Sequence, residues 1–229
     1  DPTSPTFGQI LTRIDVPPSP DVSIPTGTLG AMRPCDMSIT PDGKFLFEPD
    51  LGGETVTAVE IRSKKVVDQL LLTPFDPTVS SRVRPFMLTT NGRIALVENL
   101  EGTYAVLDVT DPYNLREIKR LTRDDGVGVS PQTSEFTPDG KYAFLIANGS
   151  TTVPGVVSVL ELGSLTVTKQ IAMPTECRPH AAAFSRDGRH FFVNCSGASS
   201  VAVIDTKLQE VVQNVALADN VTPRGVIVR

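Results

Sequence analysis

Arginines stand beside prolines that recur along the chain, and a guanidinium is well suited to bind a carboxylate or a phosphate. The four dipeptides are Arg33-Pro34, Arg84-Pro85, Arg178-Pro179 and Pro223-Arg224. Because they occupy equivalent places in an internal repeat, we expect the arginines to line one opening. The pattern predicts a site for a small anionic ligand or an acidic group of a protein partner. In the alternative interpretation, each guanidinium holds its own loop by binding carbonyl or Asp oxygens.

One step beyond two of these prolines lie side chains that could bind a metal or act as a nucleophile. His180 follows Pro179, and Cys35 and Asp36 follow Pro34. Together they would make a metal site or a Cys/His pair, but a metal site needs three or four ligands that converge. The sequence favours a hydrogen-bonded His180 inside the anion site, with no metal and no cofactor.

No motif of a known enzyme mechanism occurs in the sequence: it has no Walker loop, zincin helix, nucleophile elbow or CxxC. Four carboxylates recur at the ends of equivalent segments, and we expect them to cap the following turns through backbone N–H groups. They are Glu60, Asp108, Glu161 and Asp205. The sequence therefore names no catalytic residue, and it leaves open whether the protein is an enzyme.

The elements that must position these residues are indicated by a turn that occurs four times. Its glycines, which recur about every 48 residues, indicate a repeat architecture; they are Gly43, Gly92, Gly140 and Gly188. Asp or Asn before each glycine, between apolar runs, predicts a β-hairpin. Two further segments with alternating apolar residues complete each copy. Four antiparallel strands per copy predict an all-β protein, a β-propeller of four-stranded blades.

The repeat predicts one domain over residues 1–229, with blades at about 33–80, 81–128, 129–177 and 178–220. Residues 9–16 are predicted to be a lone closing strand and residues 222–228 a lone opening strand. The two middle strands of that fifth blade are missing. Three arrangements fit: part of a six- to eight-bladed propeller, an open arc completed by another chain or copy, and a compact five-bladed ring with a thin last blade.

The run from Asp187 to Thr206, DGRHFFVNCSGASSVAVIDT, closely resembles the consensus PDGKYLYVANSGSNTVSVIDT of the YVTN β-propeller repeat family. The third copy is also similar, the first two are looser, and the resemblance covers residues 33–228. That family includes archaeal surface-layer proteins and is related to seven-bladed lactonase-like propellers and to redox-enzyme propellers. The resemblance implies a propeller. For function we expect a binding or scaffold module, with a lactonase-like hydrolase or a redox-enzyme subunit or fragment as the alternative.

Composition narrows the classes of partner. The chain has 21 basic and 26 acidic residues, a net charge of −5 and no block of Lys or Arg longer than two residues, whereas binding to nucleic acid requires a concentrated basic surface. No apolar stretch approaches the roughly 20 residues of a membrane-spanning helix. We therefore expect neither nucleic acid as a main partner nor a transmembrane segment.

The three cysteines and the first residue of the chain indicate the cellular compartment in which the protein is expected. Cys177 and Cys195 flank one hairpin, and counting from its turn places Cys195 opposite Pro179 and Cys177 diagonally across. A disulfide there would fit an oxidising compartment, whereas two reduced thiols are the alternative. The chain starts at Asp1 without a visible signal peptide, so a mature or excised product is expected. The expected location is extracytoplasmic: periplasmic, cell-surface or secreted.

Overall fold

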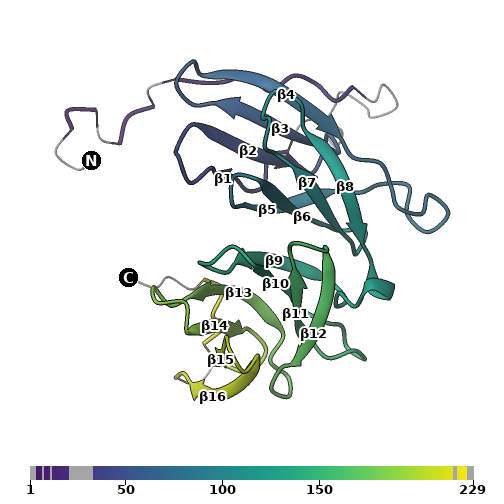
Figure 1. Cartoon of the computed structure of the whole chain (residues 1–229), viewed down its shortest axis with the longest axis vertical. Helices are drawn as coiled ribbons and strands as arrows, with labels where there is room; N and C mark the ends of the chain where they lie inside the picture. The colour runs from purple at the N-terminus through teal and green to yellow at the C-terminus, as the bar shows by residue number, and fades with distance from the viewer. Residues whose placement is uncertain (1–3, 7, 11, 21–32, 219–220, 226–229) are drawn as a thin grey trace.

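The computed structural model describes residues 4–6, 8–10, 12–20, 33–218 and 221–225. In this part the chain forms four sheets of four antiparallel strands and one short 3-10 turn, η1 (Arg123–Asp125). Within each sheet the strands pair in the order in which they follow one another in the chain. Each sheet is a blade, and the repeat's prediction of a β-propeller is confirmed (Figure 1).

The strands have the following bounds. Blade 1 contains β1 (Ser38–Ile39), β2 (Phe45–Asp50), β3 (Thr55–Glu60) and β4 (Lys65–Leu71). Blade 2 contains β5 (Pro85–Thr90), β6 (Ile94–Asn99), β7 (Tyr104–Asp108) and β8 (Arg116–Leu121). Blade 3 contains β9 (Pro131–Phe136), β10 (Tyr142–Ala147), β11 (Val156–Glu161) and β12 (Thr166–Ala172). Blade 4 contains β13 (Pro179–Phe184), β14 (His190–Cys195), β15 (Ser200–Asp205) and β16 (Glu210–Ala216).

The repeated turn joins the first and second strands of every blade. Its four glycines have φ between 67° and 85°, the left-handed region that favours glycine. In blade 3 the side chain of Asp139 accepts hydrogen bonds from the hydroxyl of Thr137 (2.7 Å) and from the backbone N–H of Lys141 (3.1 Å). The hairpin turn therefore forms as the Asp-Gly pattern predicts: the glycine takes the left-handed conformation, and the aspartate side chain accepts hydrogen bonds within the turn.

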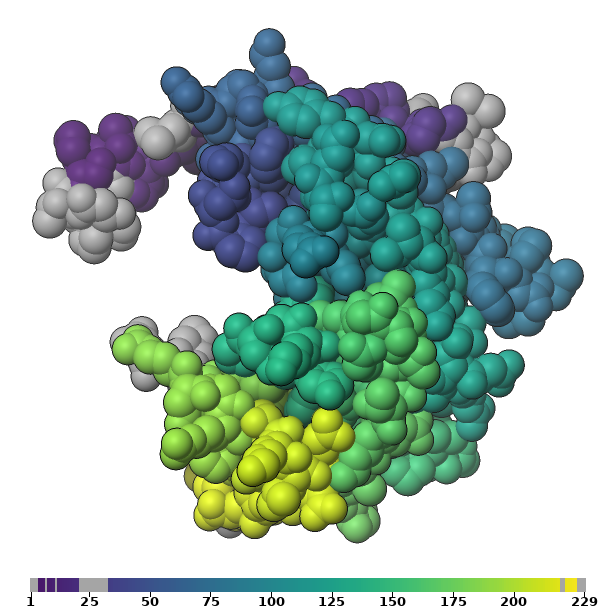
Figure 2. All heavy atoms as spheres, in the orientation of Figure 1, coloured from purple at the N-terminus to yellow at the C-terminus, as the bar shows by residue number. Residues whose placement is uncertain are grey.

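The hydrophobic core lies between neighbouring blades rather than at the centre of one sheet. Separate clusters of buried side chains join blades 1 and 2, blades 2 and 3, and blades 3 and 4. At the last junction Phe144 meets Phe184 and Phe191 edge-on, with ring centroids 5.2 and 5.0 Å apart. The first strands β1, β5, β9 and β13 are neighbours in turn. The blades therefore fan out in sequence order into an arc that is open on one side, as the space-filling view in Figure 2 shows.

The terminal segments differ from their prediction. Residues 9–10, 12–16 and 221–225 form no strand, and 226–228 lie outside the described residues. A lone first or fourth strand has no partner when the two middle strands of its blade are missing, which leaves its backbone groups unpaired. The described N-terminal segment instead contacts blade 1, where the amide of Gln69 donates to the carbonyl of Pro17 (3.1 Å).

Candidate anion-binding site

Three of the five predicted site residues lie together at the start of blade 4. Arg178, His180 and Arg224 line a hollow of about 350 Å³. The rest of its lining is polar or small and comes from blades 3 and 4 and the C-terminal segment: Gln132, Asn148, Ser196, Gly197 and Thr222. The hollow therefore combines two guanidinium groups with amide and hydroxyl groups that can donate hydrogen bonds.

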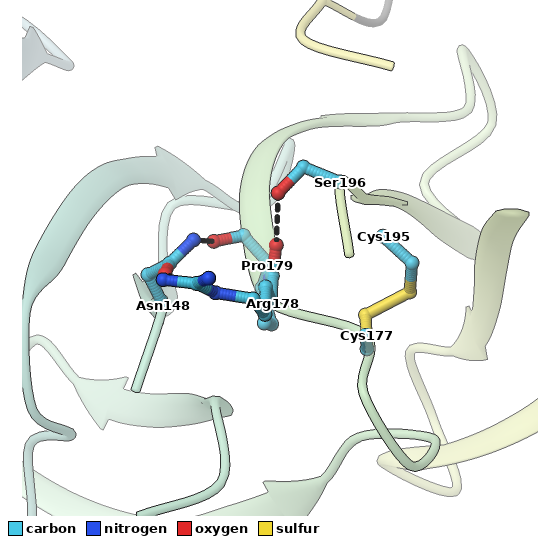
Figure 3. Close-up of a disulfide and its surroundings, with 6 residues drawn as sticks. All are labelled: Asn148, Cys177, Arg178, Pro179, Cys195 and Ser196. Carbon is cyan, nitrogen blue, oxygen red and sulfur yellow. Dashed lines mark hydrogen bonds between the residues drawn. A yellow bond between two sulfur atoms is a disulfide. The ribbon is translucent and has the colours of Figure 1, made fainter. Parts of the chain in front are cut away.

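Arg178 is held in place by contacts from both blades (Figure 3). Its carbonyl accepts from the backbone N–H (3.3 Å) and the hydroxyl (2.8 Å) of Ser196, and its Nε donates to Oδ1 of Asn148 (3.3 Å). The amide of Asn148 in turn donates to the carbonyl of Pro179 (3.0 Å). Arg178 has φ of 48°, an unfavourable backbone conformation for a side chain of this size. These contacts fix the conformation that the isolated residue would avoid.

A disulfide supports the same loop. Cys177 and Cys195 are bonded, with Cα atoms 4.1 Å apart, and both are buried. Cys195 lies opposite Pro179, the register that the hairpin predicts. Of the two alternatives for these cysteines, the structure therefore shows the disulfide. Because Arg178 and Ser196 each follow a bonded cysteine directly, the cross-link holds together the two segments that face the hollow.

Glycine at position 197 lets the arginine side chain lie close to the neighbouring loop. A Cβ atom on Gly197 would meet the carbonyl oxygen of Glu176 and would stand 2.9 Å from Cγ and Cδ of Arg178. Such a contact is too short for any side chain to be accommodated without a shift. The aliphatic part of Arg178 therefore lies across Gly197, while its guanidinium group reaches Asn148.

The charges of the hollow favour an anion. Arg178 and Arg224 are exposed, and no carboxylate within the described ranges forms an ion pair with either. Burial lowers the pKa of His180 below its ordinary value, the positive charge of Arg224 lowers it further, and a hydrogen bond to the backbone of Arg224 opposes both effects. His180 is therefore neutral at pH 7, and the arginines supply the positive charge.

The other two predicted arginines lie elsewhere along the arc. Arg33 and Arg84 stand at the starts of blades 1 and 2, and neither lines the hollow. The backbone of Arg84 is bonded on both sides: its N–H faces Oε2 of Glu54 (3.4 Å), and its carbonyl accepts from Leu100 (3.0 Å). The carbonyl of Arg33 accepts from the N–H of Leu51 (3.1 Å). Equivalence in the repeat thus gives these arginines similar places in their own blades without bringing all of them to one hollow.

The residues weighed for a metal or nucleophilic site do not assemble. Asp36 is bound to blade 2, where its carboxylate accepts from the N–H of Leu88 (3.3 Å), whereas His180 belongs to blade 4. Across the described ranges, no group of three His, Cys, Asp or Glu residues is arranged to hold a metal ion. The recurring carboxylates cap turns as expected: Glu161, for example, accepts from the N–H groups of Gly163 (3.0 Å) and Ser164 (2.7 Å).

Sequence reasoning missed a set of buried carboxyl groups. Burial raises the pKa of Glu98 to about 8 and those of Glu48 and Glu135 to about 7. Neighbouring carboxylates raise these pKa values further. Asp36 acts on Glu98 and on Glu135, and Asp50 acts on Glu48. A signal for Glu98 is present in the sequence. It stands at a strand position that holds Ile146 in blade 3, directly after the apolar run 94–97.

Comparison with known proteins supports the fold. A structure described as Kuenenia stuttgartiensis hydrazine synthase superimposes with a TM-score of 0.67 at 26% identity, over 80% of this chain and 49% of that one. Putative 6-phosphogluconolactonases from Bacteroides fragilis NCTC 9343 and Bacteroides uniformis ATCC 8492 superimpose with TM-scores of 0.61 and 0.63, each at 16% identity. They match 84% and 86% of this chain and 56% of their own length.

The chain thus spans about half the length of these similar structures. No protein-family model matches the sequence, and no curated protein matches it. The resemblance to the YVTN repeat therefore stays a prediction, whereas the similarity to these solved structures supports the fold. The chain has the β-propeller fold.

Proposed function

We propose that this protein is a binding module whose hollow at the start of blade 4 takes a small anionic ligand or an acidic group of a protein partner. The supporting observation is the placement of Arg178 and Arg224 beside Asn148, Gln132 and Ser196 in a chain of net negative charge. Guanidinium groups that have no acidic partner bind carboxylates through charge-assisted hydrogen bonds. The contact of Arg178 with Asn148 uses only Nε, which leaves the terminal N–H groups for a ligand.

A propeller subunit or segment of a larger enzyme is the second candidate. It is favoured by the likeness to the hydrazine synthase structure, which extends over most of this chain but only about half of that protein. A lactonase-like hydrolase has the support of similar folds at 16% identity, and fold alone does not carry activity. In the enzyme-subunit interpretation the open arc receives a partner chain, and the hollow binds an acidic group of that chain.

An extracytoplasmic location is part of the proposal. The Cys177–Cys195 disulfide supports it, because disulfides persist in oxidising compartments and are rare in reducing ones. In the described portion of the chain no helix is long and apolar enough to span a membrane.

Calorimetric titration with acetate and with inorganic phosphate tests the proposed site. Loss of one charge-assisted hydrogen-bonding group weakens binding by about tenfold or more, so Arg178→Ala and Arg224→Ala should each lower the affinity by that factor. The matched control is Arg189→Ala, which removes an exposed arginine at the hairpin turn of the same blade. Raising the salt concentration should weaken binding as well. Wild-type protein that binds neither anion, or arginine variants that bind like the control, would contradict the proposal.

A further inference from the structure

A second hollow adjoins the anion site. It has a volume of about 570 Å³, and Asn148, Arg178 and Gly197 line both hollows. Its other walls come from the loop 150–155, between β10 and β11, and from residues 173–177, which lead into β13. Arg178 therefore lies at the boundary between the two hollows, and a molecule bound by its guanidinium group can extend into either of them.

Both loops that form the second hollow are internally bonded. The hydroxyl of Ser150 accepts from the N–H groups of Thr152 (3.2 Å) and Val153 (3.0 Å), and the N–H of Ser150 donates to the carbonyl of Val153 (2.8 Å). In the other loop the N–H of Cys177 donates to the carbonyl of Pro174 (3.0 Å), and Cys177 is fixed by the disulfide. The hollow is thus bounded by loops whose conformation is set before a ligand binds.

The walls of the second hollow combine apolar side chains with an acidic residue, and in this they differ from the walls of the anion site. Four apolar side chains line it: Val153, Pro154, Met173 and Pro174. Its acidic residue in the described lining is Glu176, which is exposed. A second negative charge on the ligand would meet Glu176 with unfavourable electrostatic energy, whereas an uncharged apolar group would be removed from water against the four apolar side chains.

We propose that the ligand is an amphipathic monocarboxylate, with its carboxylate between Arg178 and Arg224 and its apolar tail in the hollow formed by Val153, Pro154, Met173 and Pro174. This inference rests on the proposed anion site and names the chemical class that the site selects. Two sources supply such a group: a free monocarboxylic acid with an alkyl chain, and the C-terminal end of a peptide with an apolar last residue. Both present one carboxylate and an adjacent apolar group.

The test measures affinity as the tail grows. Acetate, butanoate and hexanoate form one series, and N-acetylglycine and N-acetylleucine form the other. Complete burial of a methylene would tighten binding about fourfold. For a partly open hollow we expect hexanoate to bind at least about tenfold more tightly than acetate, or N-acetylleucine to gain similarly over N-acetylglycine. The series that shows the gain identifies the source, and a gain in either supports the inference.

Variants of the second hollow distinguish the contribution of the ligand's apolar tail to the affinity from the contribution of its carboxylate. Met173→Gln and Val153→Ser should remove most of the gain from the tail while leaving the affinity for acetate unchanged. Val153 stands on a loop outside the buried clusters, so its variant keeps the test decisive if Met173→Gln fails to fold. The matched control is Met37→Gln, which makes the same change at an exposed methionine of blade 1.

The outcomes distinguish this inference from the proposed function. If acetate binds and hexanoate and N-acetylleucine bind no more tightly than their short counterparts, the amphipathic class is wrong and the anion site stands. Tail gains that survive in both hollow variants would also overturn the inference. If no carboxylate binds in either series, both the anion site and its ligand class are wrong.

Discussion

Glu98 should make the stability of the protein fall as the pH rises. Its side chain is fully buried, and within the described part neither carboxylate oxygen has a hydrogen-bond partner. Burial raises its pKa from 4.5 to about 8, and the nearby Asp36 and Glu135 add to the shift, while the hydroxyl of Ser134, which lies close by but outside hydrogen-bonding geometry, opposes it. Between these two pKa values the folded protein holds a proton that the unfolded chain releases. Stability is therefore lost as the pH rises through this range.

The size of the effect follows from the two pKa values. Each pH unit between them changes the free energy of unfolding by about 1.4 kcal/mol, so this group destabilises the fold by roughly 3 kcal/mol between pH 5 and pH 7.5. Glu98→Gln replaces the carboxyl group with an uncharged group of the same shape and removes the titration. Relative to wild type, the variant should gain roughly 3 kcal/mol over the same pH interval.

Urea denaturation of wild type and Glu98→Gln at both pH values measures this difference. A constant penalty from burying the glutamine amide cancels in the comparison between pH values, as does the contribution of Glu48, which the two proteins share. Glu161→Gln is the control. Hydrogen bonds from Ser164 lower the pKa of Glu161, so its contribution is lost only on further acidification and should stay flat over this interval. An equal stability difference at both pH values would refute the buried-carboxyl argument.

Three other changes have defined outcomes. Phe144→Ala should destabilise the protein by about 3–5 kcal/mol in urea denaturation, because it opens a cavity between blades 3 and 4. Replacing both Cys177 and Cys195 with alanine should reduce stability by on the order of 3 kcal/mol, since the cross-link spans 18 residues, and calorimetry should show weaker acetate binding. Glu54→Ala leaves Arg82 without its carboxylate, and acetate at millimolar concentration should raise the melting temperature of this variant more than chloride does. Equal effects of the two salts would contradict this role of Glu54.

The local fold could be predicted from the sequence because its signals are local. An Asp-Gly pair fixes a hairpin turn, and counting from the turn gives the register that places Cys195 opposite Pro179. Neither step needs knowledge of distant residues. The terminal segments show the limit of this reasoning, since alternation in residues 9–16 indicates a strand only if a partner strand exists.

The candidate site was only partly predictable, because a repeat shows equivalent positions without showing which of them meet. Arg178 and Arg224 line the same hollow because the C-terminal segment passes beside blade 4, whereas Arg33 and Arg84 start blades further along the arc. Asn148 lies in a loop of the preceding blade, and its contact with Arg178 has no signal in the sequence. The sequence shows that Glu98 holds a strand position that is apolar in blade 3. Its burial cannot be read from the sequence, because it depends on blade 3 packing against blade 2.

A comparison of two blade junctions shows that the chain supplies a carboxylate to the start of one blade and not to the start of another. At the junction of blades 1 and 2, the residue directly before the third strand is Glu54, whose carboxylate accepts from the N–H groups of Val83 (2.6 Å) and Arg84 (3.4 Å). The start of blade 2 thus binds an anion that the chain itself supplies. At the junction of blades 3 and 4 the equivalent residue is Gly155, which has no side chain to reach Arg178. The start of blade 4 therefore receives no carboxylate of this chain from the position that supplies one to blade 2.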